Sequence, residues 1–336
     1  MKIGKADLDR EVLVIAEIGN NHEGIFDLAE KMVYEAASCG VQAVKFQTFQ
    51  TELFVSKADL SRYKRLKSFE LSYPQFSALA KLAHSLGLIF ISTPLDLASA
   101  KFLDSIVDCY KIASADNNFF PLLEVVAQTG KPIIISTGLS DISQVIQALD
   151  FIREKSPQKM QQEIAILHCI TSYPVPPEQV NLRAIPFLQK KLSVTVGYSD
   201  HTLGIDAALC AAALGAKIIE KHFTLDKNYS DFRDHKLSAD PPEMTMLVEK
   251  IKQISPMLGN EEKDIQPCEK EVISMVRRSI VAGTDLPRGH CLTPADLSWI
   301  RPAAGGLPPG QEHLLLGRRL KKSVVFGRQL NENDVE

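Results

Sequence analysis

The sequence lacks the features that would place a chain in a membrane or in an oxidising compartment. Nowhere do about 18 apolar residues run together, and the N-terminus MKIGKADLDREVLV has no apolar core of about 7–15 residues behind a basic head. The six cysteines form no CxxC pair, which argues against a disulfide framework and against a zinc knuckle. We therefore expect a cytoplasmic protein with reduced cysteines and no membrane partner.

Common nucleotide-binding and hydrolytic motifs are also absent. The chain has no GxSxG elbow, no GxxxxGK[ST] loop and no GxGxxG turn, which weakens assignment to the serine hydrolases, the P-loop proteins or the Rossmann dehydrogenases. The formal net charge is −3, so the chain has no general attraction to polyanions. Nucleic acid is therefore not an expected partner.

What the chain does contain is a regular alternation of short apolar runs and longer amphipathic segments from residue 12 to about residue 258. The apolar runs are VLVIAEI (12–18), AVKFQT (43–48), LIFIST (88–93), CYKIAS (109–114), PIIIST (132–137), IAILHC (164–169), VTVGYS (194–199) and AKIIEKHF (216–223). Eight β-rich runs with helical patterns between them predict a (β/α)8 barrel over residues 1–258. An open doubly wound sheet is the alternative, because periodicity alone does not show closure.

The composition of the sequence and its apolar periodicity change after the eighth unit. Residues 259–278 are charged and carry no long apolar period, which indicates a linker or a partly helical connector. Residues 279–336 hold short apolar runs separated by turns rich in Gly and Pro, which is typical of a compact β-rich module. A module of about 58 residues is marginally stable by itself, so we expect it to dock on another surface.

Polar residues gather at the ends of the predicted strands, where the active site of a (β/α)8 barrel lies. Because a strand has a period of two residues, Ser199 and His201 share a face, as do Glu220 and His222 on the next strand. Two imidazoles at the ends of neighbouring strands favour a divalent metal site, and a structural role for each histidine is the alternative.

The segment GYSDHTLG (197–204) places Ser199, Asp200 and His201 side by side, like the members of a hydrolytic triad. A triad is defined by its geometry, however, and its members are usually far apart in the sequence. Asp200 is out of phase with His201 on an extended strand, so its carboxylate would not reach the imidazole. We expect Asp200 to have a structural role.

Among the charged residues inside the apolar runs, three bear on the site. Lys45 and Lys111 are either ordinary surface lysines or buried ammonium groups, which are costly to desolvate without a partner. An anion in the barrel mouth is the simplest compensation, and two lysines favour a multiply charged one such as a phosphate ester. Glu17 follows VLVIA, so it has either a catalytic or metal-linked role or a structural ion pair.

Together these segments resemble the sialic acid synthase family, whose members condense phosphoenolpyruvate with an N-acetylated hexosamine to make nine-carbon 2-keto sugars. The matching stretches are IAEIGNNHEG (15–24), VKFQTF (44–49), FISTP (90–94), YKIASADNN (110–118), KPIIISTG (131–138), LHCITSYPVPPEQVNL (167–182), GYSDHTLGI (197–205), EKHFTLDK (220–227) and RDHKLS (233–238). The segment SIVAGTDLPRGHCLTPADLSWIRP (279–302) resembles the antifreeze-like (SAF) domain of the same family.

The resemblance implies a role for particular residues. His201 and His222 match metal ligands, with Mn²⁺ the expected ion and Mg²⁺ or Co²⁺ the alternatives. Glu17 and Asp116 fall at acidic positions near the reacting centre, and Asp116 stands where many members have Glu. The positions that match phosphoenolpyruvate-binding residues are Lys45, Lys111, Ser114 and Ser199.

The resemblance also implies contacts to the sugar and a partner subunit. Asp234 matches an acid that contacts the amino sugar, and Tyr173 is expected to line the rim as a sugar contact, with a role in shaping the loop as the alternative. Thr171 stands where members often carry an Asn that binds the phosphate. Arg301 matches an arginine that the SAF domain of one subunit inserts into the barrel mouth of its partner. The implied assembly is a domain-swapped homodimer.

The function implied is a metal-dependent condensation of phosphoenolpyruvate with N-acetylmannosamine and water, which yields sialic acid and phosphate. A legionaminic or pseudaminic acid synthase that uses a diacetamido-trideoxyhexose is the alternative within this class. Alternatives from other classes are a non-catalytic carbohydrate-binding protein and a metal-dependent aldolase that cleaves such keto sugars.

Overall fold

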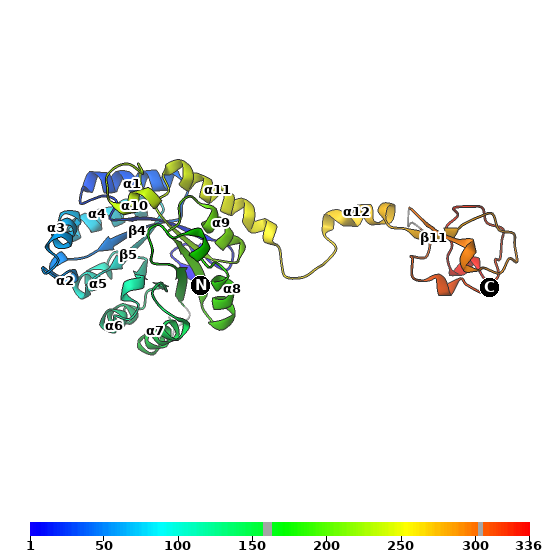
Figure 1. Cartoon of the computed structure of the whole chain (residues 1–336), viewed down its shortest axis with the longest axis horizontal. Helices are drawn as coiled ribbons and strands as arrows, with labels where there is room; N and C mark the ends of the chain where they lie inside the picture. The colour runs from blue at the N-terminus through cyan, green and yellow to red at the C-terminus, as the bar shows by residue number, and fades with distance from the viewer. Residues whose placement is uncertain (157–162, 302–304) are drawn as a thin grey trace. The chain divides into compact units, whose positions relative to one another are not determined.

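The computed structural model describes residues 1–156, 163–301 and 305–336 of the chain (Figure 1). The described residues divide into two compact units, Met1–Gly259 and Asn260–Glu336. Of the helices in these residues, none is both long enough and apolar enough to cross a membrane. Each unit has its own hydrophobic core and is described by itself.

The first unit is a closed barrel of parallel strands surrounded by helices, as the sequence predicts. Its strands are β3 (Leu13–Gly19), β4 (Ala43–Thr48), β5 (Ile89–Pro94), β6 (Cys109–Ile112), β7 (Ile133–Ser136), β8 (Ile164–Cys169), β9 (Thr195–Asp200) and β10 (Ile218–His222). Closure is made by β10 pairing with β3, where His222 lies opposite Glu17. The alternative of an open sheet is therefore wrong.

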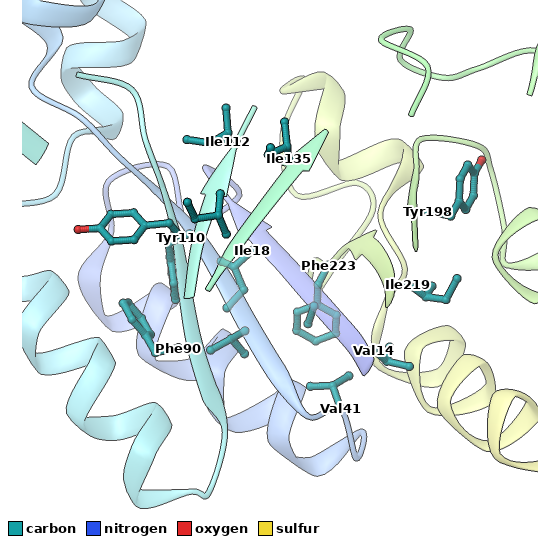
Figure 2. Packing of buried hydrophobic residues seen from close by; sticks show 14 of the residues in the cluster. Val14, Ile18, Val41, Phe90, Tyr110, Ile112, Ile135, Tyr198, Ile219 and Phe223 are labelled. Atoms are coloured by element: carbon teal, nitrogen blue, oxygen red, sulfur yellow. The ribbon is translucent and has the colours of Figure 1, made fainter. Parts of the chain in front are cut away.

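Helices follow the strands and cover the outside of the barrel (Figure 1). They are α1 (Phe26–Ser38), α2 (Thr51–Phe54), α3 (Leu60–Phe69), α4 (Tyr73–Ser85), α5 (Leu97–Leu103), α6 (Phe120–Gln128), α7 (Ile142–Lys155), α8 (Ala184–Lys191), α9 (Asp206–Ala213), α10 (Arg233–Leu237) and α11 (Pro241–Leu258). Some begin at clear sequence signals, such as the capping box that Asp141 and Gln144 form at the start of α7. Figure 2 shows part of the apolar cluster that holds strands and helices together.

Side chains on each strand alternate between this outer cluster and the barrel interior. In β3, for example, Val14 belongs to the outer cluster, whereas Leu13 and Ile15 belong to a separate inner cluster. A short N-terminal hairpin, β1 (Lys2–Ile3) with β2 (Ala6–Asp7), adds Ile3 and Leu8 to the inner cluster. This hairpin is not among the elements predicted from the sequence. It gives the barrel an apolar floor.

Gly197 marks a place where the interior of β9 has no room for a side chain. A Cβ atom built on it would lie 2.5 Å from the carbonyl oxygen of Ile218 and 2.6 Å from Cδ2 of Leu167. Both distances are well below van der Waals contact, and one of the atoms belongs to the backbone of the neighbouring strand β10.

Replacing Gly197 by alanine should therefore strain the β9–β10 pair. We expect Gly197→Ala to lower the free energy of unfolding by about 1–3 kcal/mol, as overpacking of a filled core usually does. Urea denaturation of the full chain measures this change. An unchanged midpoint would show that the strands can separate there at no cost.

The second unit is small and β-rich. It contains α12 (Pro267–Val276) and the antiparallel pair β11 (Ser279–Ala282) and β12 (Leu297–Ile300). Isolated bridges such as Leu286 with Val324 complete its backbone pairing. Its own core is formed by buried aliphatic side chains, among them Ile280 and Leu330. The predicted β-rich module is confirmed.

Candidate active site

A pocket of about 610 Å³ opens at the carboxyl ends of the barrel strands. Most of the predicted site residues line it: Glu17, Lys45, Lys111, Ser114, Asp116, Tyr173, Ser199, His201, His222 and Asp234. The exception is Arg301, which follows β12 in the second unit and is exposed. Parity on the strands explains part of the convergence, because Glu17, Lys45, Lys111, Ser199 and His222 continue the inward-facing series that begins in the apolar floor. Ser114, Asp116, Tyr173 and Asp234 lie in the segments that follow the strands.

The deepest layer of the pocket is a network of buried charges centred on Glu220. The Lys45 Nζ atom lies 2.8 Å from Glu220 Oε1 and 3.3 Å from Glu17 Oε2, and Lys111 Nζ lies 3.6 Å from Glu220 Oε1. Ser199 Oγ donates a hydrogen bond of 2.9 Å to the same Glu220 oxygen. The side chains of both lysines and both glutamates are at most 4% exposed.

This network corrects one inference from the sequence. We expected an anion in the barrel mouth to be the simplest compensation for two buried lysines, but Glu17 and Glu220 already stabilise Lys45 and Lys111, so the burial of the lysines does not by itself require an anion. Glu220 has no role in the sequence prediction, although the face that it shares with His222 is a usable signal.

The same network shifts the pKa values of its members. Burial raises the pKa of Glu17 although Lys45 opposes this, and burial alone would raise that of Glu220, but Lys111 and Lys45 hold its pKa well below the usual range. Burial lowers the pKa of Lys111 to about 8. For Lys45, burial alone would lower the pKa, but Glu17 and Glu220 raise it above its ordinary value. Glu220 is therefore the firmly ionised carboxylate of the layer.

Above this layer His201 and His222 lie close together, with their ring centroids 5.4 Å apart. The Nδ1 atom of His201 is 2.8 Å from the carbonyl oxygen of Ile170, so in the neutral ring Nδ1 donates and Nε2 keeps its lone pair. His222 Nδ1 is buried and has no hydrogen-bond partner in the described part of the chain. Burial and then the neighbouring His201 lower the pKa of His222 well below its usual range, which keeps this imidazole neutral.

For His201, burial alone would lower the pKa, but the contact with Cys169 raises it above its ordinary value. Two imidazoles that present a ring nitrogen to the pocket, once His201 is deprotonated, are suitable donors for a divalent transition metal. Within residues 1–156, 163–301 and 305–336, no group of three or more His, Cys, Asp or Glu side chains could hold a metal ion. The histidines therefore fit an ion that has two protein ligands and takes its other ligands from water or substrate.

A small polar recess lies beside Lys111, at the ends of β6, β7 and β8. The backbone N–H of Gly138 donates to Ser114 Oγ at 3.1 Å, and a Cβ atom on Gly138 would lie only 2.3 Å from Thr171 Oγ1. The hydroxyl groups of Thr171 and Ser136 are buried without a hydrogen-bond partner among the described residues. Unpaired hydroxyl donors beside a lysine suit the oxygen atoms of an anion.

The outer part of the pocket is built by Tyr173, Arg233 and Asp234. The Arg233 guanidinium lies 4.5 Å from the ring centroid of Tyr173, and its Nε atom is 3.3 Å from Asp234 Oδ1. The sequence analysis did not single out Arg233. Burial raises the pKa of Asp234 and raises that of Asp116 to about 6. These residues offer charged and aromatic contacts to a polar ligand.

On the outer face of the same strands, Asp200 and Lys221 form a completely buried ion pair. Lys221 Nζ lies 3.0 Å from Asp200 Oδ2 and donates to the carbonyl oxygen of Thr202 at 2.6 Å. Asp200 Oδ1 also accepts from the Thr202 N–H at 2.8 Å. Asp200 thus points away from the pocket, as predicted, and ties together the strand ends that carry His201 and His222.

Removing one member of this pair should strongly destabilise the barrel. We expect Lys221→Met to lower the free energy of unfolding by about 3–5 kcal/mol, because it leaves the Asp200 carboxylate buried without its counter-ion. The double variant Asp200→Asn/Lys221→Met should recover part of this loss. Urea denaturation measures both, and Lys227→Met is the matched control, because the pair that Lys227 forms with Glu243 is partly exposed. Equal losses in the Lys227 and Lys221 variants would contradict the expectation.

The raised pKa of Asp116 predicts a pH-dependent stability. Folding moves its pKa from 3.8 to about 6, so the folded chain favours the protonated carboxyl and is destabilised once Asp116 ionises. Asp116→Asn should match the wild type in thermal stability below about pH 4 and exceed it above about pH 6. Melting curves across this range test it, with Asp231→Asn, an exposed acid at the same pocket, as the control. A gain that does not depend on pH would contradict this cause.

A closed parallel barrel whose strand ends hold paired lysines, carboxyls and two histidines defines a barrel enzyme with a polar, anion-compatible site. The pattern of the NeuB family matches residues 32–263, and that of the SAF domain matches residues 277–336. The chain therefore belongs to the NeuB family, and the resemblance found in its sequence is confirmed.

Three relatives illustrate this membership. The N,N'-diacetyllegionaminic acid synthase of Legionella pneumophila is 37% identical over 96% of this chain and 94% of its own length. The human N-acetylneuraminate-9-phosphate synthase is 32% identical over 93% of this chain and 89% of its own length. A crystal structure of the N-acetylneuraminic acid synthetase of Leptospira borgpetersenii, in complex with citrate, covers 81% of this chain and 94% of that one, at 33% identity and a TM-score of 0.76. The chain is accordingly a synthase.

Proposed function

We propose that this synthase condenses phosphoenolpyruvate with an N-acetylated hexosamine and water, which gives a nine-carbon 2-keto sugar acid and phosphate. The observation that carries the proposal is the buried layer of Lys45, Glu220 and Lys111 beside the recess at Gly138. A small, multiply charged anion fits this place, because it can take hydrogen bonds from the unpaired hydroxyl groups while both ammonium groups face it.

We assign the phosphate of phosphoenolpyruvate to Lys111, Ser114 and the recess, and its carboxylate to Lys45 and Ser199. In this arrangement C3 of phosphoenolpyruvate faces the histidine pair and the outer pocket, where the acceptor aldehyde enters. The two ammonium groups are fixed by Glu220 before the ligand arrives, so little reorganisation is needed as charge develops on the leaving phosphate.

The carbon–carbon bond forms between C3 of phosphoenolpyruvate and the aldehyde carbon, and cationic character develops at C2. Water adds to C2 and loses a proton to a carboxylate, for which Glu17 and Asp116 are the candidates in the pocket. The tetrahedral carbon then expels phosphate as the ketone forms. A divalent ion held by His201 and His222, Mn²⁺ or alternatively Mg²⁺ or Co²⁺, would supply Lewis acidity toward the aldehyde oxygen.

N-acetylmannosamine is the first candidate acceptor, with Tyr173 and Asp234 as its contacts. A diacetamido-trideoxyhexose is the second candidate, supported by the 37% identity to the Legionella N,N'-diacetyllegionaminic acid synthase. A pseudaminic acid precursor remains an alternative within the same class. Phosphate release with each sugar in turn, with the product identified by mass spectrometry, decides among them. Turnover with pyruvate in place of phosphoenolpyruvate would instead indicate an aldolase.

We also propose that Arg301 acts in the barrel of a second copy of the chain, as a domain-swapped homodimer allows. Support comes from the place of Arg301 within residues 277–336, which the SAF domain pattern matches, and within a separately folded unit. In a homodimer, Arg301→Ala should chiefly raise KM for the sugar. Analytical ultracentrifugation tests the assembly, and a monomer with full activity would exclude this role.

The histidine pair gives the sharpest test of the site. We expect His222→Ala to lower metal-stimulated phosphate release by at least about 100-fold, because it removes one of two protein ligands. Binding of Mn²⁺, followed by electron paramagnetic resonance, should weaken in parallel. His313→Ala, which changes an exposed histidine of the second unit, is the control. Full metal-stimulated activity in His222→Ala would show that the assignment is wrong.

A further inference from the structure

The loop between β3 and α1 lies against the segment that joins β10 to α10, residues 223–232. In this loop Asn21 is completely buried, and its Nδ2 atom donates to the carbonyl oxygen of Phe223 at 2.8 Å and to Ser238 Oγ at 2.9 Å. Ser238 Oγ in turn donates to the carbonyl oxygen of Asp234 at 2.6 Å. The loop after the first barrel strand therefore holds the backbone on both sides of the β10–α10 segment.

Glu23 of the same loop contacts the segment through its carboxylate. Its Oε1 atom accepts a hydrogen bond from Ser230 Oγ and lies 3.3 Å from Nε2 of His235. The side chain of His235 is completely buried, and its Nδ1 atom lies 2.7 Å from Thr224 Oγ1. One carboxylate and one imidazole thus connect the start and the end of the β10–α10 segment to the neighbouring loop.

The backbone at Glu23 is held in a strained conformation. Its φ of +47° lies in the left-handed region, which residues with a Cβ atom rarely adopt. The next residue, Gly24, packs so closely on α3 that a Cβ atom there would lie 2.0 Å from the carbonyl oxygen of Ser68. Strain of this kind persists only where the surrounding structure imposes it, and it is concentrated at functional sites. The loop is therefore fixed, and with it the direction of the Glu23 carboxylate.

The β10–α10 segment leads directly into residues of the pocket. Its last residue, Phe232, packs on Phe69 of α3 with ring centroids 5.2 Å apart. Arg233 and Asp234 follow and line the pocket, whereas His235, the next residue, is completely buried and is not among the described residues that line it. Because these residues share the short helix α10, a shift of His235 moves Asp234 as well.

We infer that Glu23 and His235 are positioning residues for the acceptor sugar, which they serve by holding Asp234 in place. The inference rests on the proposed function, in which Asp234 contacts the sugar. Neither Glu23 nor His235 is among the described residues that line the pocket, so both act through the segment and not on the ligand. Sugar binding should therefore depend on these contacts, while the buried layer that binds phosphoenolpyruvate should not.

Steady-state kinetics of the full chain test this role. Phosphoenolpyruvate is saturating, and the varied sugar is N-acetylmannosamine or a diacetamido-trideoxyhexose, whichever the wild type turns over faster. We expect Glu23→Ala to raise KM for the sugar at least about 10-fold and to change kcat less than about 3-fold, because a misplacement of about 1 Å can cost about 100-fold. Glu23→Gln, which keeps a side-chain oxygen at the same reach, should recover most of this loss.

Lys227→Met is the matched control. It removes a partly exposed ion pair between the same segment and Glu243, and it should leave KM and kcat unchanged. If Glu23→Ala fails to fold, Ser230→Ala removes one of the two contacts of Glu23 and should show the same change in KM at a smaller size.

Hydrogen exchange followed by mass spectrometry, without any substrate, examines the segment itself. The backbone amides of residues 224–234 should exchange at least about 10-fold faster in Glu23→Ala than in the wild type, because lost contacts lower the free energy of local opening. Lys227→Met should exchange like the wild type in the same peptides.

Three outcomes would overturn the inference, and they separate it from the proposed function. Faster exchange with no change in KM for the sugar would leave Glu23 a structural role only. Equal increases in KM for both substrates, or the same change in Lys227→Met, would show a general loss of stability. Absence of turnover with every sugar in the wild type would overturn the proposed function and this inference with it.

Discussion

The chemistry of this barrel depends on one buried carboxylate, that of Glu220, placed between two lysines. An ammonium group in an apolar interior would otherwise lose its proton or disrupt the fold, because burial disfavours charge. Glu220 keeps Lys45 and Lys111 at the bottom of the pocket in fixed positions and receives a hydrogen bond from Ser199. The lysines can therefore present positive charge to a ligand from inside the protein.

Below this layer the barrel is closed by aliphatic side chains, and the N-terminal hairpin seals its lower end. Such a floor holds water away from the lysines on one side, so a ligand can reach them only from the mouth. The functional side chains therefore lie in layers at different depths of the pocket. The most firmly fixed charges lie at the bottom, the histidines above them, and the residues held by loops and short helices at the rim.

The sequence predicts the strands and most of the inward-facing residues. It does not predict the contacts that form between distant strands when the barrel closes. Eight apolar runs indicate the strands, and the two-residue period correctly places Ser199, His201 and His222 on the inside and Asp200 on the outside. Glu220 carried the same signal, but its importance follows from lying opposite two lysines on strands distant in the sequence. The hairpin at Ile3 and the loop that carries Glu23 have no local pattern that separates them from ordinary surface segments.

Adjacent residues at the ends of β9 and β10 face opposite sides of the barrel wall. Asp200 and Lys221 join the strands outside the barrel, and the next residues, His201 and His222, face the pocket. A single inserted or deleted residue in either strand would exchange the inner and outer residues of that strand, placing Asp200 or Lys221 in the cavity without its partner and an imidazole in the packed outer layer. These strands can therefore diverge only by substitution, whereas the β4–α4 connection and the segment after β10 can also change in length. New acceptor specificities in such a barrel should arise from those two connections, above a floor whose spacing stays constant.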